Sequence, residues 1–302
     1  MRKFAFLLSF IIIICTALLT GCSSESPAQI AATTLPVYEF TSRLCSGTGL
    51  SVARLVAEEV SCLHDYSLNV RQVKAAESAE LIVISGAGLE AFLDDILLNK
   101  ASIDASENIE LITPNVHHHG HKESQEEEHE DHDSHHHEED PHIWLSPANA
   151  MIMAENICKG LSASYPHFSS QFQENLSALL AELAELYAHG TNLLTDLSCR
   201  ELITFHDGFS YLAQAYDLTI LDAIEEESGS EASAKELIHM IEEVEHHNLP
   251  AIFTEKSGSV SAAGIISRET GTKEYALDMA MAGDSYFDAM YHNINTLKEA
   301  LQ

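Results

Sequence analysis

Three histidines and one aspartate are the residues of this chain best suited to metal chemistry. Each of them ends or follows a run of residues that is typical of a β-strand. They are His64, His142, His206 and Asp278. Three imidazole nitrogens and one carboxylate oxygen fill a tetrahedral shell around Zn²⁺ and leave no position for a catalytic water. Ca²⁺ and Mg²⁺ prefer oxygen ligands, so this set of residues predicts a closed zinc site.

The elements that would position these residues alternate between short apolar runs and amphipathic stretches. Strand-like and helix-like segments follow each other before residue 113 and again after residue 200. This order predicts parallel sheets with helices on both faces, and ligands of such sheets bind beyond the carboxyl ends of the strands. The expected strands are 29–35, 51–56, 80–85, 109–112, 201–204, 218–221, 251–254 and 273–277.

A long helical pattern separates the two series. Leucines recur close to the helical period over 168–197, directly after a shorter helical pattern at 147–164. We predict an α/β protein with two lobes, each with a parallel sheet flanked by helices, joined by one long rigid helix. The predicted divisions are a signal peptide at 1–21, a lipid-anchored tether at 22–28, an N-terminal lobe at 29–165, a linking helix at 166–197 and a C-terminal lobe at 198–302.

The N-terminal residues carry the pattern of an export signal. Arg2 and Lys3 precede an uncharged apolar run at 4–19, which is shorter than the roughly 20 residues that a membrane span needs. The segment LTGC at 19–22 resembles a bacterial lipobox, in which the signal is cleaved before a cysteine that then carries lipid. We expect Cys22 to anchor the protein at the extracytoplasmic face of the cell membrane. An ordinary signal peptide or a membrane anchor is the alternative.

Four cysteines remain in the mature chain once the signal is removed and Cys22 carries lipid. Disulfides persist in exported proteins, and four cysteines allow three pairings. We favour the pairings that stay within one half of the chain, Cys45–Cys62 and Cys158–Cys199. Free buried thiols are the alternative.

Histidine and acidic residues are concentrated in one low-complexity run, 117–140. It contains nine His and ten Asp or Glu against one Lys, and no apolar residue, so we expect a loop outside any core. We interpret it as a weak, multi-site zinc collector beside the tight site. A solvated acidic loop without a specific role is the alternative. The formal net charge of −32 over 302 residues argues against nucleic acid as a partner, because phosphates would be repelled.

Three motifs give the chain a family resemblance: SGAGLE at 85–90, DPHIWLSP at 140–147 and TFHDGFSYL at 204–212. With them, nearly the whole mature chain resembles the solute-binding lipoproteins of bacterial zinc and manganese ABC importers, often called cluster A-I or family 9. The resemblance implies a monomeric extracytoplasmic receptor, not an enzyme. Such a receptor captures Zn²⁺ between two lobes and delivers it to a membrane permease and its ATPase. The second motif would supply His142 as a ligand, and the third His206.

The chain departs from the family pattern around the first and last ligands. Family members usually carry Pro-His-x-Tyr-Glu at the first ligand, where this chain reads LHDYS at 63–67. The His and the Tyr keep their register, so we retain His64 as a ligand. The last-strand motif usually continues as Asp-Pro-Leu-Gly, whereas this chain reads DMAMAG at 278–283. Glu255 is therefore the alternative to Asp278, and a water is another. We expect Glu255 to have a supporting or structural role.

The third ligand separates the metals. Manganese-type members of the family have a carboxylate where this chain has His206, and imidazole-rich shells suit zinc, so we predict zinc, with manganese or iron as the alternative. Two alternatives come from other classes: a surface adhesin or metal-storage protein that acts through the run at 117–140, and a secreted zinc hydrolase. The sequence contains no HExxH motif and no separate candidate base, which argues against the hydrolase.

Overall fold

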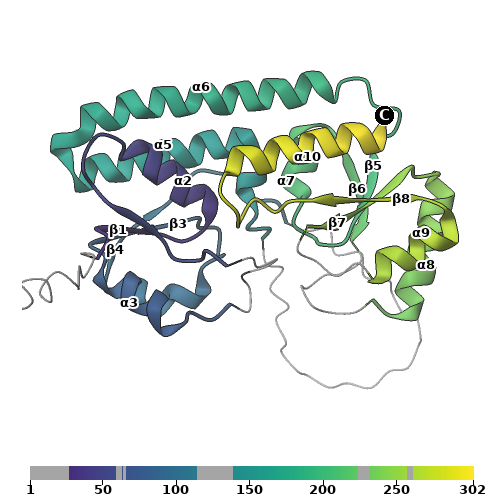
Figure 1. Ribbon diagram of the computed structural model, residues 1–302, viewed down its shortest axis with the longest axis horizontal. Coiled ribbons are helices and arrows are strands. Elements are labelled where there is room, and N and C mark those ends of the chain that lie inside the picture. The colour runs from purple at the N-terminus through teal and green to yellow at the C-terminus, as the bar shows by residue number, and fades with distance from the viewer. Residues whose placement is uncertain (1–26, 59–62, 64–65, 114–138, 224–231, 257–260) are drawn as a thin grey trace, which may run out of the picture.

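The computed structural model of the protein describes residues 27–58, 63, 66–113, 139–223, 232–256 and 261–302. Within these ranges, two four-stranded parallel sheets form the centres of two lobes. Their strand orders are β2-β1-β3-β4 and β6-β5-β7-β8. Figure 1 shows the two sheets side by side, with helices around them. The predicted α/β architecture with two parallel-sheet lobes is confirmed.

The first lobe is built by alternation of strands and helices. Its central strand is a continuous apolar run, LIVI, that is buried on both faces, as is typical of a parallel sheet. The helix before that strand begins with a capping box, in which Asn69 and Gln72 satisfy each other's backbone N–H groups. The elements are β1 (Ile30–Ala32), α2 (Leu35–Leu44), β2 (Val52–Arg54), α3 (Val70–Ser78), β3 (Leu81–Ile84), η1 (Ala91–Leu93), α4 (Asp94–Leu97) and β4 (Ala101–Asp104).

The last strand of this lobe differs from the prediction. The expected strand at 109–112 is wrong, and β4 instead pairs with β3 through residues 101–104. β4 is an edge strand in which Ile103 is the one buried side chain, so it lacks the apolar run used to find strands. Ile109 is buried without joining the sheet. The helical stretch between β3 and β4 is short and consists of η1 and the four residues of α4.

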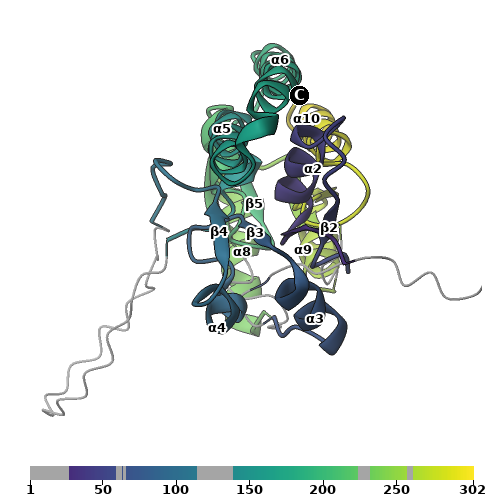
Figure 2. The ribbon, with the colours of Figure 1, turned by 90° about the vertical axis from the view of Figure 1, so that its left-hand side faces the viewer.

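A helical pair follows the sheet of the first lobe: η2 (Ile143–Leu145), α5 (Pro147–Ser164), η3 (Pro166–Phe168) and α6 (Ser169–Leu193). The 25-residue α6 confirms the long helix, although it ends four residues before the predicted limit. It packs against α5 and α2 of the first lobe and against the C-terminal helix, α10 (Tyr286–Leu301). In both Figures 1 and 2 α6 lies at the top of the molecule, and Figure 1 shows it extending from above the first lobe toward the second.

The second lobe follows the prediction closely, with each of its four expected strands present within a few residues and helices between them. Its elements before α10 are β5 (Glu201–Thr204), α7 (Ser210–Ala215), β6 (Thr219–Ala223), α8 (Ala234–His247), β7 (Ala251–Glu255), α9 (Ser261–Thr270) and β8 (Lys273–Leu277). The C-terminal helix α10 packs on β8, α6 and α2. Its first residue, Tyr286, contacts Phe40 of the first lobe, and its last, Leu301, accepts a hydrogen bond from Ser198 N, just before β5.

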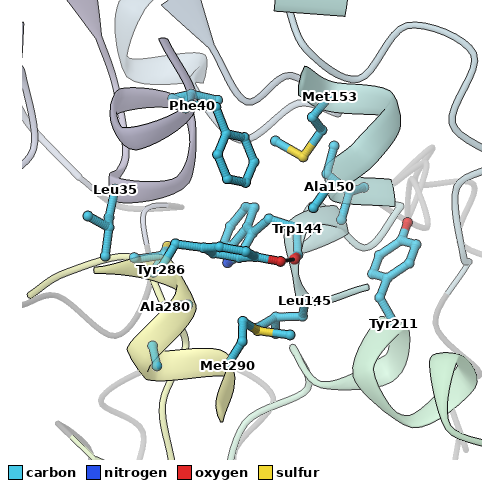
Figure 3. Close-up of a cluster of buried hydrophobic side chains, with 14 of the residues drawn as sticks. Leu35, Phe40, Trp144, Leu145, Ala150, Met153, Tyr211, Ala280, Tyr286 and Met290 are labelled. Carbon is cyan, nitrogen blue, oxygen red and sulfur yellow. Dashed lines mark hydrogen bonds between the residues drawn. The ribbon is translucent and has the colours of Figure 1, made fainter. Parts of the chain in front are cut away.

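One continuous core joins the two lobes. The buried apolar side chains of α2, α5, α6, β5, β7 and α10 belong to a single cluster. Figure 3 shows part of it, with Phe40, Trp144 and Tyr286 packed together at the junction. The Tyr286 hydroxyl donates to Trp144 O (2.8 Å), and Leu35 N donates to Met281 O (3.2 Å). Because interiors of this kind are close-packed, we expect the lobes to move little relative to each other.

The cysteines do not form the predicted bridge in the C-terminal half. Cys158 and Cys199 are both free thiols. Cys158 is buried on α5 and accepts a hydrogen bond from Gln173 Nε2 on the neighbouring helix, whereas the thiol of Cys199 donates to the carbonyl of Glu201. Cys45 is also a free, buried thiol, and its expected partner, Cys62, lies outside the described residues.

The export signal and Cys22 likewise lie outside the described residues. Every helix in the described part of the chain is too short or too polar to cross a bilayer.

Candidate metal centre

Two buried imidazoles meet at the boundary between the lobes. His142 precedes η2, at the end of the first lobe, and His206 follows β5 in the second. Their exposed fractions are 2% and 4%, and their Nε2 atoms lie 3.5 Å apart. Two nitrogens that each bind a tetrahedral Zn²⁺ at 2.0–2.1 Å are separated by about 3.3 Å. The pair therefore has the spacing of one edge of a zinc coordination tetrahedron.

A carboxylate fixes the orientation of His142. Asp140 Oδ1 lies 2.8 Å from His142 Nδ1 and also accepts a hydrogen bond from His142 N (2.9 Å). A carboxylate can only accept here, so Nδ1 carries the proton and Nε2 presents its lone pair toward His206. The other oxygen of Asp140, Oδ2, is buried and has no hydrogen-bond partner among the described residues. The carboxylate therefore acts on His142 through Oδ1 alone.

His206 has a similar arrangement with a different carboxylate. Glu255, the last residue of β7, places Oε1 3.6 Å from His206 Nδ1, and both side chains are buried. Carboxylates behind metal-binding histidines orient the ring and raise the basicity of the nitrogen that faces the metal. The supporting role expected for Glu255 is the role that this geometry favours.

Gly208 leaves room for the His206 ring. A Cβ at this position would lie 2.6 Å from His206 Cδ2 and 2.9 Å from His206 Nε2. It would also lie 2.7 Å from the Cε atom of Met279, in the segment after β8. The close approach of these three residues shows that the segment after β8 packs directly beside the His206 imidazole.

Asp278 is not brought together with the two histidines. Its Oδ1 accepts a hydrogen bond from Ala280 N (2.8 Å), and its Oδ2 pairs with Lys256 Nζ (3.2 Å). The backbone of Asp278 is held by Asn293 of α10, whose side-chain amide accepts from Asp278 N and donates to Asp278 O. Across the residues that the structure describes, no three His, Cys, Asp or Glu side chains are grouped to hold a metal ion.

The remaining predicted elements of the site lie outside the described residues. His64 belongs to the segment between β2 and α3, and only Leu63 of its immediate neighbours is described. The histidine–acid run lies outside the described residues up to residue 138, whereas its last residue, Asp140, is among them. Asp140 is the partner of His142, so it belongs to the metal centre and not to the loop in which the sequence pattern placed it.

The first lobe contains a buried carboxylate at the carboxyl ends of β1 and β3. Glu90, in the SGAGLE motif, accepts hydrogen bonds from Thr33 Oγ1 (2.6 Å), Ser85 N (2.7 Å) and Gly86 N (3.0 Å). Burial raises the pKa of Glu90 to about 7, and the three hydrogen bonds oppose that rise. Glu90 thereby ties the carboxyl ends of β1 and β3 together.

Comparison with known proteins identifies the family. The sequence profile of the periplasmic zinc-uptake complex component A family, ZnuA, matches residues 30–300. This match covers both lobes and every residue of the site described above. The chain belongs to the ZnuA family.

Relatives agree in sequence and fold. The zinc-binding lipoprotein AdcA of Streptococcus pneumoniae strain R6 is 29% identical over 318 residues, which cover 99% of this chain and 61% of AdcA. This chain therefore spans less than two thirds of the length of that relative. A crystal structure of ZnuA superposes with a TM-score of 0.75 at 27% identity, over 91% of this chain and 100% of ZnuA. The Zn(II)-bound ZnuA-like domain of S. pneumoniae AdcA superposes with a TM-score of 0.72 at 27% identity, over 90% and 98%.

Within this ZnuA-family fold, sequence reasoning missed the residues that support the ligands. Asp140 is hard to recognise because it is the last residue of a run of acids and histidines, although its place two residues before His142 is a usable signal. Gly208 and Tyr211 lie in the TFHDGFSYL motif and received no role. Their roles depend on contacts with segments far away in the chain, which no local pattern reveals.

Proposed function

We propose that this chain is the extracytoplasmic zinc receptor of an ABC importer, which captures Zn²⁺ between its lobes and delivers it to a membrane permease and its ATPase. The observation that carries the proposal is the buried pair of Nε2 atoms, 3.5 Å apart, with a carboxylate at the Nδ1 side of each ring. Two such lone pairs pointing at each other in a buried place favour a cation between them. Membership of the ZnuA family supports this assignment.

The proposed ligands are His64, His142, His206 and Asp278. Only the pair formed by His142 and His206 rests on described geometry. His64 would add the third imidazole from the segment after β2. Asp278 would have to exchange its contacts with Lys256 and Ala280 for the metal, so we expect it to contribute less than the imidazoles.

Zinc is favoured over manganese by the donor atoms. Three imidazoles form a nitrogen-rich shell, which suits Zn²⁺ better than the harder Mn²⁺. The zinc bound to the similar domain of S. pneumoniae AdcA supports the same choice for this chain. We therefore propose Zn²⁺ as the transported cargo.

The mechanism of capture follows from the shared core. Trp144, Tyr286 and the segment after β8 link the lobes through hydrogen bonds and packing, so large hinge opening is disfavoured. We infer that the metal enters through local movement of the segments that carry His64 and His142. The carboxylate partners keep His142 and His206 oriented, and this reduces the ordering cost of binding.

Location and anchoring are part of the proposal. The chain would be exported by residues 1–21 and held at the outer face of the cell membrane by lipid on Cys22. The word lipoprotein in the name of the S. pneumoniae relative supports this. We propose a monomer, with the run at 117–140 as a weak zinc collector. Deleting residues 117–138 should then lower the number of weakly bound zinc ions and leave one tightly bound ion.

The experiment is a competition for zinc between the mature chain and a chromophoric chelator. The chelator must bind zinc more tightly than the weak sites do, so that only a tight site retains the ion. The wild type should hold one zinc ion, His206→Ala should lose it, and the remote His167→Ala should retain it. A cell lacking this receptor should regain growth in zinc-poor medium when supplied with the wild type, but not with His206→Ala. Tight zinc binding by His206→Ala would contradict the site. Normal growth of the deletion strain with unchanged zinc uptake, together with lost surface adhesion, would favour an adhesin.

A further inference from the structure

The hydroxyl of Tyr211 closes a ring of three hydrogen bonds. It donates to Asp140 O (2.9 Å) and accepts from Ile112 N (3.0 Å), while Asp140 N donates to Ile112 O (2.8 Å). Every polar group in this ring is satisfied by another member of it. Ile112 and Asp140 stand on the two sides of residues 114–138, so the ring joins the chain before and after that run.

Tyr211 also joins the two lobes at the metal centre. It lies on α7, five residues after His206, whereas Ile112 and Asp140 belong to the chain that leads to His142. The hydroxyl therefore connects the segment that carries one proposed ligand with the segment that carries the other. Figure 3 shows the Tyr211 side chain rising from α7 at the side of the buried cluster to which it belongs.

The environment of Tyr211 suits a permanent hydrogen-bond donor. Its side chain is 1% exposed, and burial raises the pKa of the hydroxyl to about 12. The hydroxyl thus keeps its proton at any physiological pH and continues to donate to Asp140 O. The packing of the aromatic ring of Tyr211 does not depend on its hydroxyl, because a phenylalanine side chain would fill the same space.

One residue, Asp140, connects Tyr211 to the proposed ligand His142. The hydroxyl holds the backbone of Asp140, and the carboxylate of the same residue holds the backbone N and the Nδ1 of His142. Asp140 Oδ2 has no hydrogen-bond partner among the described residues, so no second contact of that carboxylate replaces this anchoring. A shift of the Asp140 backbone would therefore pass directly to the imidazole.

We propose that Tyr211 is a positioning residue for zinc capture, whose hydroxyl fixes Asp140 and thereby aims His142 Nε2 at His206. This inference rests on the proposed function, because the orientation of His142 matters for function only if the site binds a metal. The TFHDGFSYL motif then has two roles: it supplies His206 as a ligand, and its Tyr211 positions His142.

The test uses the full mature chain with four variants: Tyr211→Phe, Asp140→Ala, both together, and Tyr165→Phe as the matched control. Tyr165 lies between α5 and η3, and its hydroxyl makes one long contact, 3.4 Å, with the exposed Glu80. Zinc affinity is measured by competition with a strong chelator. The tautomer of His142 is read from long-range ¹H–¹⁵N NMR spectra of the metal-free protein.

We expect Tyr211→Phe to weaken zinc binding at least tenfold, within the range known for groups that orient metal ligands, and Tyr165→Phe to leave it unchanged. In the double variant, Tyr211→Phe should add less than about twofold to the loss caused by Asp140→Ala, because both act on one path. The His142 signal of Tyr211→Phe should lose its single Nδ1-protonated pattern.

Equal affinities of Tyr211→Phe and Tyr165→Phe would overturn the inference, as would losses that multiply in the double variant. A wild type that holds no zinc against the chelator would instead overturn the proposed function. In that case the NMR spectra still decide the role of Tyr211, since an unchanged His142 tautomer in Tyr211→Phe would refute it without any metal.

Discussion

The indole Nε1 of Trp144 donates a hydrogen bond of 2.8 Å to the carbonyl oxygen of Met279. The two residues come from different lobes, and each stands beside a proposed ligand: Trp144 two residues after His142, and Met279 one residue after Asp278. The Trp144 side chain is completely buried and also contacts the His142 ring edge-on, with centroids 5.5 Å apart. This single hydrogen bond therefore links the lobe junction to the metal centre.

Replacing Trp144 by Phe should destabilise the protein and loosen the site. The change removes the donor to Met279 O and leaves a cavity, which together cost about 2 to 4 kcal/mol of unfolding free energy. Urea unfolding of the metal-free protein measures this loss, and chelator competition should show weaker zinc binding. If the unfolding free energy of the variant lies within roughly 0.5 kcal/mol of the wild-type value, as for a neutral surface substitution, the junction does not depend on Trp144.

Gly208→Ala should weaken zinc binding through the His206 ring. The added Cβ would lie 2.9 Å from Nε2, so the imidazole must rotate away from His142. We expect a loss of affinity of about ten- to a hundredfold, as for other changes that misplace a metal ligand. Gly264→Ala is the matched control, because a Cβ at Gly264 meets no atom of the described residues within 4 Å. Equal zinc affinities of the two variants would mean that the His206 ring has more freedom than its contacts indicate.

Glu90 should make stability fall as the pH rises. Its pKa in the folded protein is about 7, above the ordinary value of 4.5, so between these pH values the folded state keeps a proton that the unfolded state releases. The contribution is complete below about pH 4.5 and is lost as the pH passes 7, by at most about 3 kcal/mol at 1.36 kcal/mol per pKa unit.

Glu90→Gln mimics the protonated carboxyl and removes this titration. Urea unfolding at pH 5 and pH 8 should therefore show the variant gaining stability relative to the wild type as the pH increases. A constant difference between the two proteins across this range would show that Glu90 is ionised in the folded state at both pH values.

Lys256→Gln should strengthen zinc binding if Asp278 is the fourth ligand. Lys256 competes with the metal for Asp278 Oδ2, but its side chain is 65% exposed, so we expect a gain of no more than about fivefold. The same substitution in an Asp278→Asn background should have less effect, because there is no carboxylate left to release. Zinc titrations of the four proteins measure this coupling. If Lys256→Gln increases zinc affinity equally in the presence and absence of the Asp278 carboxylate, Lys256 acts only by general charge repulsion of the cation.

The sequence was sufficient to predict most of the fold. Apolar runs such as LIVI at 81–84 and the leucine period of α6 follow directly from burial, and they located the sheets and the long helix. β4 was misplaced because an edge strand with one buried residue, Ile103, lacks such a pattern. The Cys158–Cys199 pairing failed because closeness within one half of the chain does not bring two thiols together: Cys158 is buried on α5, whereas Cys199 lies between α6 and β5.

The sequence was sufficient to predict the two histidines at the centre of the site, but not the residues that hold them in place. His142 and His206 were found from their positions near strand ends and from their motifs, and the structure brings their Nε2 atoms together. The supporting contacts of Asp140, Tyr211 and Gly208 depend on tertiary geometry between segments distant in the chain. Asp278 was chosen from its place at the end of β8, but the direction of a side chain after a strand depends on its neighbours, here Lys256 and Ala280.

The central claim is most directly tested by a crystal structure of the zinc-loaded protein with anomalous scattering recorded on both sides of the zinc absorption edge. The account predicts one strong anomalous peak at the lobe boundary, about 2.1 Å from Nε2 of both His142 and His206. A peak elsewhere in the molecule, with these two imidazoles unbound, would contradict it.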